Sequence, residues 1–239
     1  MTPDSVGGQI QEIRTRYSDA YAIRAGIQAI PGIGGSLDTL LAGGASKIQM
    51  QRLESYVQML QSRMSAIEEV AADLGSEGFS DFILSTIDQA IHTRSVQKRQ
   101  RLVQVVGRQA TLAFSWDEAE SAARLLASLE EMHVAVLREA VNAPMATGPY
   151  EGHRIVTLEK ATHAGSASNS INLRDLFSSY ESHVLELACS ELVSRGLLRD
   201  EGVGRLSTKS MTVFVATDLA NWLWKWISLP QEVQRKEGD

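Results

Sequence analysis

The chain has 239 residues, a formal net charge of −6, and a composition of 44% hydrophobic and 22% charged residues. This length suffices for one large domain or two modest ones, each with its own core. The negative net charge disfavours a protein dedicated to binding nucleic-acid phosphates. The single cysteine, Cys189, lies between apolar neighbours in a helical pattern, which suits a reducing compartment. We therefore expect a cytoplasmic protein, with no signal peptide or transmembrane helix.

The first part of the chain, residues 1–141, is predicted to be a helical bundle. Apolar residues fall at helical spacing over residues 9–30, and Pro31 ends that helix. The clearest periodicity runs from Met50 to Leu74, where apolar residues repeat at spacings of three and four. Three more helices are expected over residues 79–92, about 95–114, and 115–141, the last one continuous and capped by Ser115.

An apolar, glycine-rich segment lies over residues 26–45. Its GIGG sequence fails the tests for a phosphate-binding loop, because no Gly-Lys-Ser/Thr follows it and no strand precedes it. The glycines favour close packing of helices. An alternative is that residues 27–45 insert shallowly into a membrane. The candidate residues for either role are Ile30, Pro31, Gly32, Ile33, Gly34 and Gly35.

Residues 142–228 are predicted to form a winged-helix-like α+β domain. Its first helix would be shared with residues 126–141, and residues 229–239 form a polar tail. The expected elements are a strand within 153–160, helices over 173–178 and 180–195, strands over 197–199 and 211–216, and a helix over 218–227. Helix, strand, two helices and a strand pair is the winged-helix order. The predicted fold class is therefore mainly α, with an N-terminal helical bundle followed by this α+β domain.

The third helix of this pattern is acidic. A winged helix reads base edges with Arg, Lys, Asn and Gln side chains. Here Glu181, Glu186 and Glu191 stand against one cation, Arg195. The domain is therefore expected to contact protein, with DNA binding as the alternative.

One basic cluster stands out between His92 and Phe114, a stretch without acidic residues. It could contact nucleic acid or anionic lipid. It could equally face the acidic start of the following helix or form a solvated helix face. Ser95 and Lys98 also match the Ser-x-x-Lys of a serine-enzyme motif, but the companion motifs are missing, so Ser95 is better explained as a helix cap. The cluster consists of Arg94, Lys98, Arg99, Arg101 and Arg108.

The remaining candidate residues do not indicate a catalytic or metal site. Trp222, Trp224 and Trp226 spread around more than one helix face, so they either cover the domain core or contact another chain. Glu130 and His133 form a lone Glu-x-x-His, and a di-iron bundle would need a second one, so His133 is expected in the core. No nucleophile, base and orienting group can be assembled. We expect no catalytic or metal site, no cofactor and no small-molecule substrate, whereas the long apolar stripes are compatible with a homo-oligomer.

Three segments carry a family resemblance: residues 22–60 (AIRAGIQAIPGIGGSLDTLLAGGASKIQMQRLESYVQML), residues 93–108 (TRSVQKRQRLVQVVGR) and residues 126–144 (LASLEEMHVAVLREAVNAP). The chain resembles uncharacterised bacterial helical proteins of the conflict or abortive-infection type with a closing winged-helix-like domain. This resemblance implies a component of anti-phage, that is antiviral, defence. The expected function is a non-enzymatic interaction or regulatory protein that binds a protein partner. The alternatives are a winged-helix DNA-binding transcriptional regulator and a membrane-perturbing effector.

Overall fold

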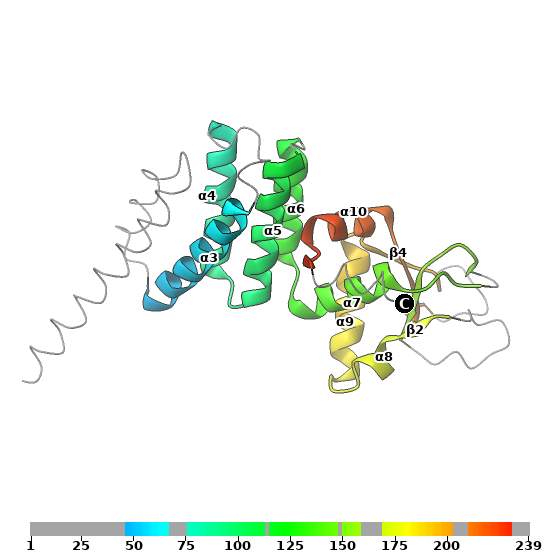
Figure 1. The fold of residues 1–239 in the computed structure, drawn as a ribbon. Helices are drawn as coiled ribbons and strands as arrows, with labels where there is room; N and C mark the ends of the chain where they lie inside the picture. The colour runs from blue at the N-terminus through cyan, green and yellow to red at the C-terminus, as the bar shows by residue number, and fades with distance from the viewer. Residues whose placement is uncertain are drawn as a thin grey trace, which may run out of the picture. The chain divides into compact units, whose positions relative to one another are not determined.

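A computed structural model describes residues 46–66, 76–112, 115–147, 150–158, 169–202 and 210–230. It is mainly helical with a small mixed sheet in the C-terminal part, which confirms the predicted fold class (Figure 1). The chain divides into a helical unit, residues 1–127 and 227–239, and an α+β unit, residues 128–226. The described elements are α3 (Lys47–Ser65), α4 (Glu77–His92), α5 (Val96–Leu112), α6 (Trp116–Ser128), α7 (Glu131–Asn142), β1 (Ile155–Thr157), β2 (Ile171–Asn172), α8 (Leu173–Leu176), α9 (Ser182–Ser194), β3 (Leu198–Asp200), β4 (Val213–Ala216) and α10 (Asp218–Ile227).

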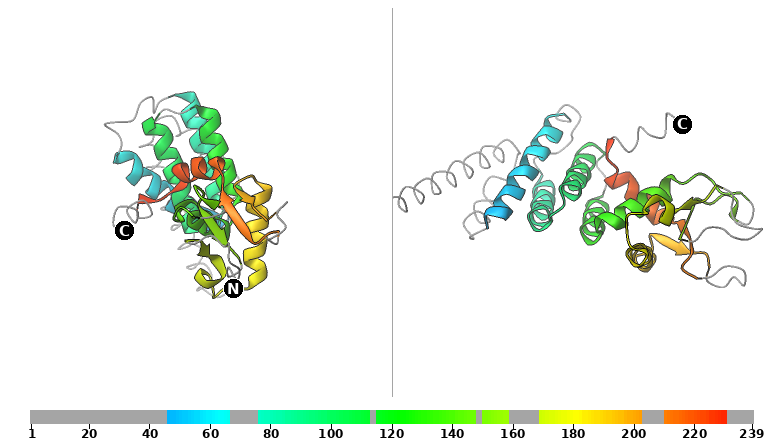
Figure 2. Two further views of the ribbon diagram at one scale, coloured as in Figure 1. Left: turned by 90° about the vertical axis from the view of Figure 1, so that its right-hand side faces the viewer. Right: turned by 90° about the horizontal axis from the view of Figure 1, so that it is seen from below.

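The core of the helical unit lies between α3, α4 and α5, which pack against one another (Figures 1 and 2). The apolar stripe of α3 faces this core, as its periodicity predicted. Tyr56 is fully buried there, and its hydroxyl donates to Thr86 Oγ1 at 2.9 Å. Burial raises the pKa of Tyr56, so its phenol stays a neutral donor. The buried side chains of the stripe are Leu53, Tyr56, Val57, Leu60 and Met64.

The helix α3 begins at a capping box and ends at Ser65. Ser46 Oγ accepts the Gln49 N–H, and the Gln49 side chain accepts the Ser46 N–H. The helix was expected to continue to Leu74, but α3 ends at Ser65 with Ala66 as its C-cap. Residues 67–74 lie outside the described residues, as do the helix predicted over residues 9–30 and the glycine-rich segment 26–45. Among the residues described, no helix combines the length and apolar character that a membrane-spanning segment requires.

The prediction of one continuous helix over residues 115–141 was wrong. The predicted start of the helix after Ser115 is confirmed, because Ser115 Oγ accepts the Glu118 N–H. However, α6 ends at Ser128 and α7 begins at Glu131, with the Glu130 backbone extended at φ −87° and ψ 169°. The His133 ring accepts the Glu130 N–H at 2.9 Å and so caps the new helix. The apolar spacing predicted one continuous helix because it runs through the break without interruption: Leu126 before it, Leu129 within it and His133 after it are all buried.

The α+β unit holds a four-stranded sheet among the described residues, in the order β2-β1-β4-β3. The β4 strand pairs antiparallel with both β1 and β3. Strand β2 adds to the other edge of β1 in parallel, and its two residues were too few to give a sequence signal. Helices α7 and α9 pack against each other, and α7 also contacts β1 and β4. Helix α7, which lies within the stretch 126–141 predicted to be shared with the second domain, belongs to the α+β unit.

The turn between β3 and β4 is closed at its base by one carboxylate. Asp200 accepts the Gly202 N–H on one oxygen and the Met211 N–H on the other, each at 2.8 Å. Met211 has a φ of 60°, in the left-handed region, and this backbone shape needs such local support. Asp200 therefore fixes where the two strands of the hairpin separate.

Candidate interaction site

The basic cluster is mostly buried instead of forming an exposed patch. Arg94 precedes α5 and is exposed. Three residues of the first turns of α5 are buried, with exposed fractions of 8% for Lys98, 5% for Arg99 and 5% for Arg101. Arg108, nearer the end of α5, is half-buried. A buried cation is stable only where it is hydrogen-bonded, so the partners of these side chains decide their role.

The end of α4 receives two guanidinium groups. Arg99 Nη1 donates to the Thr93 carbonyl, and Arg52 Nη1 donates to the Ile91 carbonyl, both at 3.1 Å. The last carbonyls of a helix lack partners within the helix and carry partial negative charge. Burial lowers the pKa of Arg99, and the neighbouring Arg52 lowers it further. An arginine still remains charged at neutral pH. The two side chains therefore act as charged caps of α4.

Lys98 has the same role at the end of α6. Its Nζ donates to the Ala127 carbonyl at 3.1 Å. Its own backbone N–H donates to Ser95 Oγ at 2.9 Å, which confirms Ser95 as the helix cap of α5. The Ser-x-x-Lys spacing is thus explained by helix capping together with a carbonyl contact.

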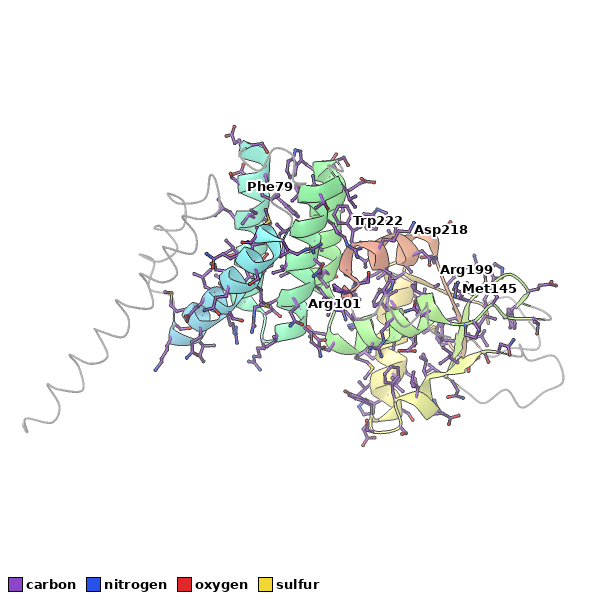
Figure 3. The ribbon with its side chains drawn as sticks, in the orientation of Figure 1. Phe79, Arg101, Met145, Arg199, Asp218 and Trp222 are labelled. Atoms are coloured by element: carbon purple, nitrogen blue, oxygen red, sulfur yellow. The ribbon has the colours of Figure 1, made fainter. Side chains whose placement is uncertain are left out.

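Two further arginines of α5 hold the chain that follows Trp226. Arg101, labelled in Figure 3, donates from Nη1 to the Ile227 carbonyl at 2.9 Å. Arg108 Nη2 donates to the carbonyl and to the hydroxyl of Ser228, at 3.3 and 3.1 Å. Burial lowers the pKa of Arg108, with a smaller contribution from Arg63. These contacts, within the helical unit, fix residues 227 and 228 on α5.

Gly107, which was not predicted to have a role, makes room for a further cation, Arg63 of α3. Gly107 lies inside α5, where glycine costs about 1 kcal/mol relative to alanine. A Cβ at this position would lie 2.6 Å from Arg63 Nε, so any side chain would displace Arg63. The absence of a side chain at Gly107 therefore allows the Arg63 side chain of α3 to lie directly on α5. A lone glycine in an amphipathic helix was the only signal for this contact.

The tryptophans of α10 are largely covered by the protein itself. Trp224 and Trp226 are buried, and Trp222 is half-buried. Trp222 and Trp226 contact each other edge-on, with ring centroids 6.2 Å apart. Of the three, Trp222, labelled in Figure 3, is the one that is partly exposed, as the predicted contact with a partner requires.

The α9 helix presents a surface without cations. Its sequence, SHVLELACSELVS, contains no Lys or Arg. Arg195 follows directly, but its guanidinium contacts Glu191 Oε2 at 3.0 Å and the Ser128 carbonyl at 3.4 Å. The residues of α9 that face solvent are Ser182, His183, Glu186, Leu187, Ser190 and Ser194.

Large apolar side chains are exposed where α8 leads into α9. The exposed fractions are 50% for Leu176, 53% for Tyr180 and 59% for Leu187. The Phe177 and Tyr180 rings meet edge-on, with centroids 6.4 Å apart. Arg174 of α8 donates to Glu186 Oε1 of α9 at 2.8 Å and ties the two helices together.

The buried His133 has a structural role within the α+β unit. Its Nδ1 accepts the Glu130 N–H, and its Nε2 lies 3.1 Å from Glu191 Oε2. Burial lowers the pKa of His133, and nearby Arg195 adds to this, against Glu191 and Glu130, which raise it. A neutral ring is required, because a protonated Nδ1 could not accept the Glu130 N–H. Within the described residues, no group of His, Cys, Asp and Glu side chains is placed to hold a metal ion.

Cys189 is also buried in α9. Burial, with a contribution from Glu186, raises the pKa of this thiol to about 12. A thiol is a nucleophile only as the thiolate, so Cys189 serves as a core residue.

The candidate residues from Ile30 to Gly35 lie outside the described residues. Arg205 and Lys209, two basic residues between β3 and β4, also lie outside them. Comparisons with protein-family models, with curated proteins and with solved structures gave no match. The site must therefore be interpreted from its own geometry.

Replacing Arg101 with alanine should destabilise the protein. The Ile227 carbonyl would lose a charged donor in a buried setting, at a cost of roughly 1–3 kcal/mol in the free energy of unfolding. The matched control is Arg94→Ala, an exposed member of the same cluster, expected to change stability by less than about 0.5 kcal/mol. Urea unfolding followed by circular dichroism measures both. Equal changes in the free energy of unfolding for Arg101→Ala and Arg94→Ala would contradict the structural role of Arg101.

Stability should fall as the pH drops below about 6.5, the ordinary pKa of histidine. The folded state holds His133 at a lower pKa, so below that value the unfolded state binds the proton more readily. The stability that neutral His133 contributes is fully present above the pKa that His133 has in the unfolded state. It is lost as the pH falls toward the lower pKa that His133 has in the folded state. Unfolding free energies measured from pH 7.5 to 5 should show a weaker pH dependence in His133→Gln than in the parent. The exposed His183→Gln serves as control, and an identical profile in His133→Gln would refute this account.

Proposed function

We propose that the chain is a non-enzymatic interaction protein whose α+β unit is a winged-helix-like module that contacts protein in place of DNA. The observation that carries the proposal is that the solvent-facing residues of α9 include Glu186 and Leu187 but no Lys or Arg, and that the exposed Glu181 directly precedes them. In the winged-helix order this is the third helix, the one that enters the major groove in DNA-binding members.

The order and pairing of the elements support the winged-helix-like assignment. Helix α7, strand β1, helices α8 and α9, and the β3–β4 hairpin follow one another, with β4 between β1 and β3. Strand β2 is an addition at the β1 edge. Asp200 closes the base of the hairpin that would form the wing.

Electrostatics support a protein partner. Glu181 and Glu186 are exposed at the start of α9, where DNA phosphates would approach. Arg195 is engaged by Glu191 and by the Ser128 carbonyl. Most of the basic cluster donates to carbonyls within the helical unit and offers no broad cationic face. The resemblance to bacterial conflict proteins extends this proposal to an adaptor or regulator in anti-phage defence.

A labelled random DNA duplex should not bind the protein. Fluorescence anisotropy at low and at physiological salt should show no salt-sensitive binding up to tens of micromolar, the weak end of ordinary non-specific affinity. A variant with Glu181→Lys and Glu186→Lys should gain weak, salt-sensitive binding, because it places cations on the third helix. The control with Glu151→Lys and Asp218→Lys makes the same charge change at exposed sites of the same unit and should gain less.

Binding by the parent protein would overturn the proposal. The decisive result is salt-sensitive affinity that is lost when Arg94, Arg205 and Lys209 become alanine. These variants test the DNA alternative better than substitutions at Lys98, Arg99 or Arg101, because those three side chains are buried and bonded to carbonyls.

A further inference from the structure

We propose that Arg63 and Arg108, together with the Ser228 hydroxyl, form a binding site for a phosphate group. Arg63 comes from the last turn of α3, Arg108 from the second half of α5, and Ser228 from the chain just after α10. All three residues belong to the helical unit. The inference goes beyond the proposed function, because it assigns a ligand to the unit that the proposed function leaves without one.

The side chain of Arg63 lies directly on α5, next to Arg108. A Cβ placed on Gly107 would lie 2.6 Å from Arg63 Nε and 3.1 Å from its Cγ. The Arg63 charge is close enough to lower the pKa of Arg108, as the second cause after burial. Like charges repel each other more strongly where burial reduces screening by water. The fold therefore holds two cations together at a cost in electrostatic energy.

The described residues supply no carboxylate to compensate this pair. Arg63 Nε is buried without a hydrogen-bond acceptor. Arg108 donates to the carbonyl and hydroxyl of Ser228, which are neutral acceptors. Arg52 and Arg99 are also close to each other, but both donate to carbonyls at the end of α4, which carry partial negative charge. Within the described part of the chain, Arg63 has no such acceptor.

A phosphate group matches the chemistry of this pair. A guanidinium presents a planar fork of N–H donors that suits the oxygens of a phosphate, and two of them balance the charge of a phosphate dianion. Ser228 Oγ accepts from Arg108, so the same hydroxyl can donate its hydrogen to the anion. Both arginines are half-buried, which leaves them open to a small ligand while strengthening its attraction. The phosphate is either soluble, free or on a small molecule, or part of a lipid headgroup.

Isothermal titration calorimetry of the intact protein with inorganic phosphate tests the site, at an ionic strength held constant with chloride. We expect saturable binding by the parent. Arg63→Met should weaken it by about tenfold or more, because the anion loses a charged donor. Arg94→Met, at an exposed cation of the same unit, is the matched control and should bind like the parent. Competition by adenosine monophosphate would identify a soluble carrier, and competition by phosphatidic acid vesicles a lipid; either supports the site.

Stability measurements distinguish a ligand site from an ion pair within the protein. Arg63→Met places a methyl group where the unpartnered Nε lies and removes the repulsion of Arg108. In phosphate-free buffer, the urea midpoint of this variant should therefore equal or exceed that of the parent. Added phosphate should raise the midpoint of the parent and of Arg94→Met but not that of Arg63→Met, because a ligand of the folded state stabilises it.

Three results would overturn the inference: no saturable phosphate binding by the parent, unchanged binding by Arg63→Met, or a lower urea midpoint of Arg63→Met in phosphate-free buffer. The last result would show that an anionic group of the protein already compensates Arg63. Competition by duplex DNA would assign the two cations to nucleic acid and would overturn the proposed function as well. Absence of phosphate binding, without any DNA binding, defeats this inference alone.

Discussion

The helical unit depends on hydrogen bonds from buried and half-buried cations to carbonyls at the ends of helices and in the segment after α10. Arg52 and Arg99 serve α4, Lys98 serves α6, and Arg101 and Arg108 serve residues 227 and 228. A helix leaves its last four carbonyls without internal partners, and these carry the negative end of the helix dipole. A hydrogen bond to a charged group contributes about 1.5–3 kcal/mol, which offsets part of the cost of removing the cation from water. In the α+β unit, Arg154 donates in the same way to Ala143, which ends α7.

This arrangement explains why a cluster of positive charge in the sequence does not produce a positive face. Helix α9 ends differently, because Gly196 follows it two residues after Ser194 with a φ of 70°, and the N–H groups of Gly196 and Leu197 donate to the carbonyls of Val193 and Leu192. Neither α4 nor α6 is followed by a glycine, and side chains from α3 and α5 supply the missing donors. In the described part of the α+β unit, α9 and the residue before it expose Glu181, Glu186 and Leu187 but no Lys or Arg.

The sequence predicted those features whose causes are local. The α3 stripe, the Ser95 and Ser115 caps and the strands β1, β3 and β4 follow from spacing and residue type, and the structure confirms them. The break before α7 was missed because apolar spacing continues through it, while the cap depends on the tautomer of His133. The role of Arg101 could not be predicted, since its carbonyl partner lies 126 residues away in the chain. Charge patterning alone does not distinguish a solvated cation from one bonded to a distant carbonyl.

The structural role of the basic cluster is tested most directly by the chemical reactivity of Lys98. Amine acetylation by an activated ester, followed by mass spectrometry of the native protein, compares Lys98 with the exposed Lys47 and Lys225. If Lys98 Nζ donates to the Ala127 carbonyl in a buried position, it should react much more slowly than the other two and match them only after unfolding. Reaction of Lys98 at the rate of Lys47 in the folded protein would contradict the claim that the basic cluster is structural.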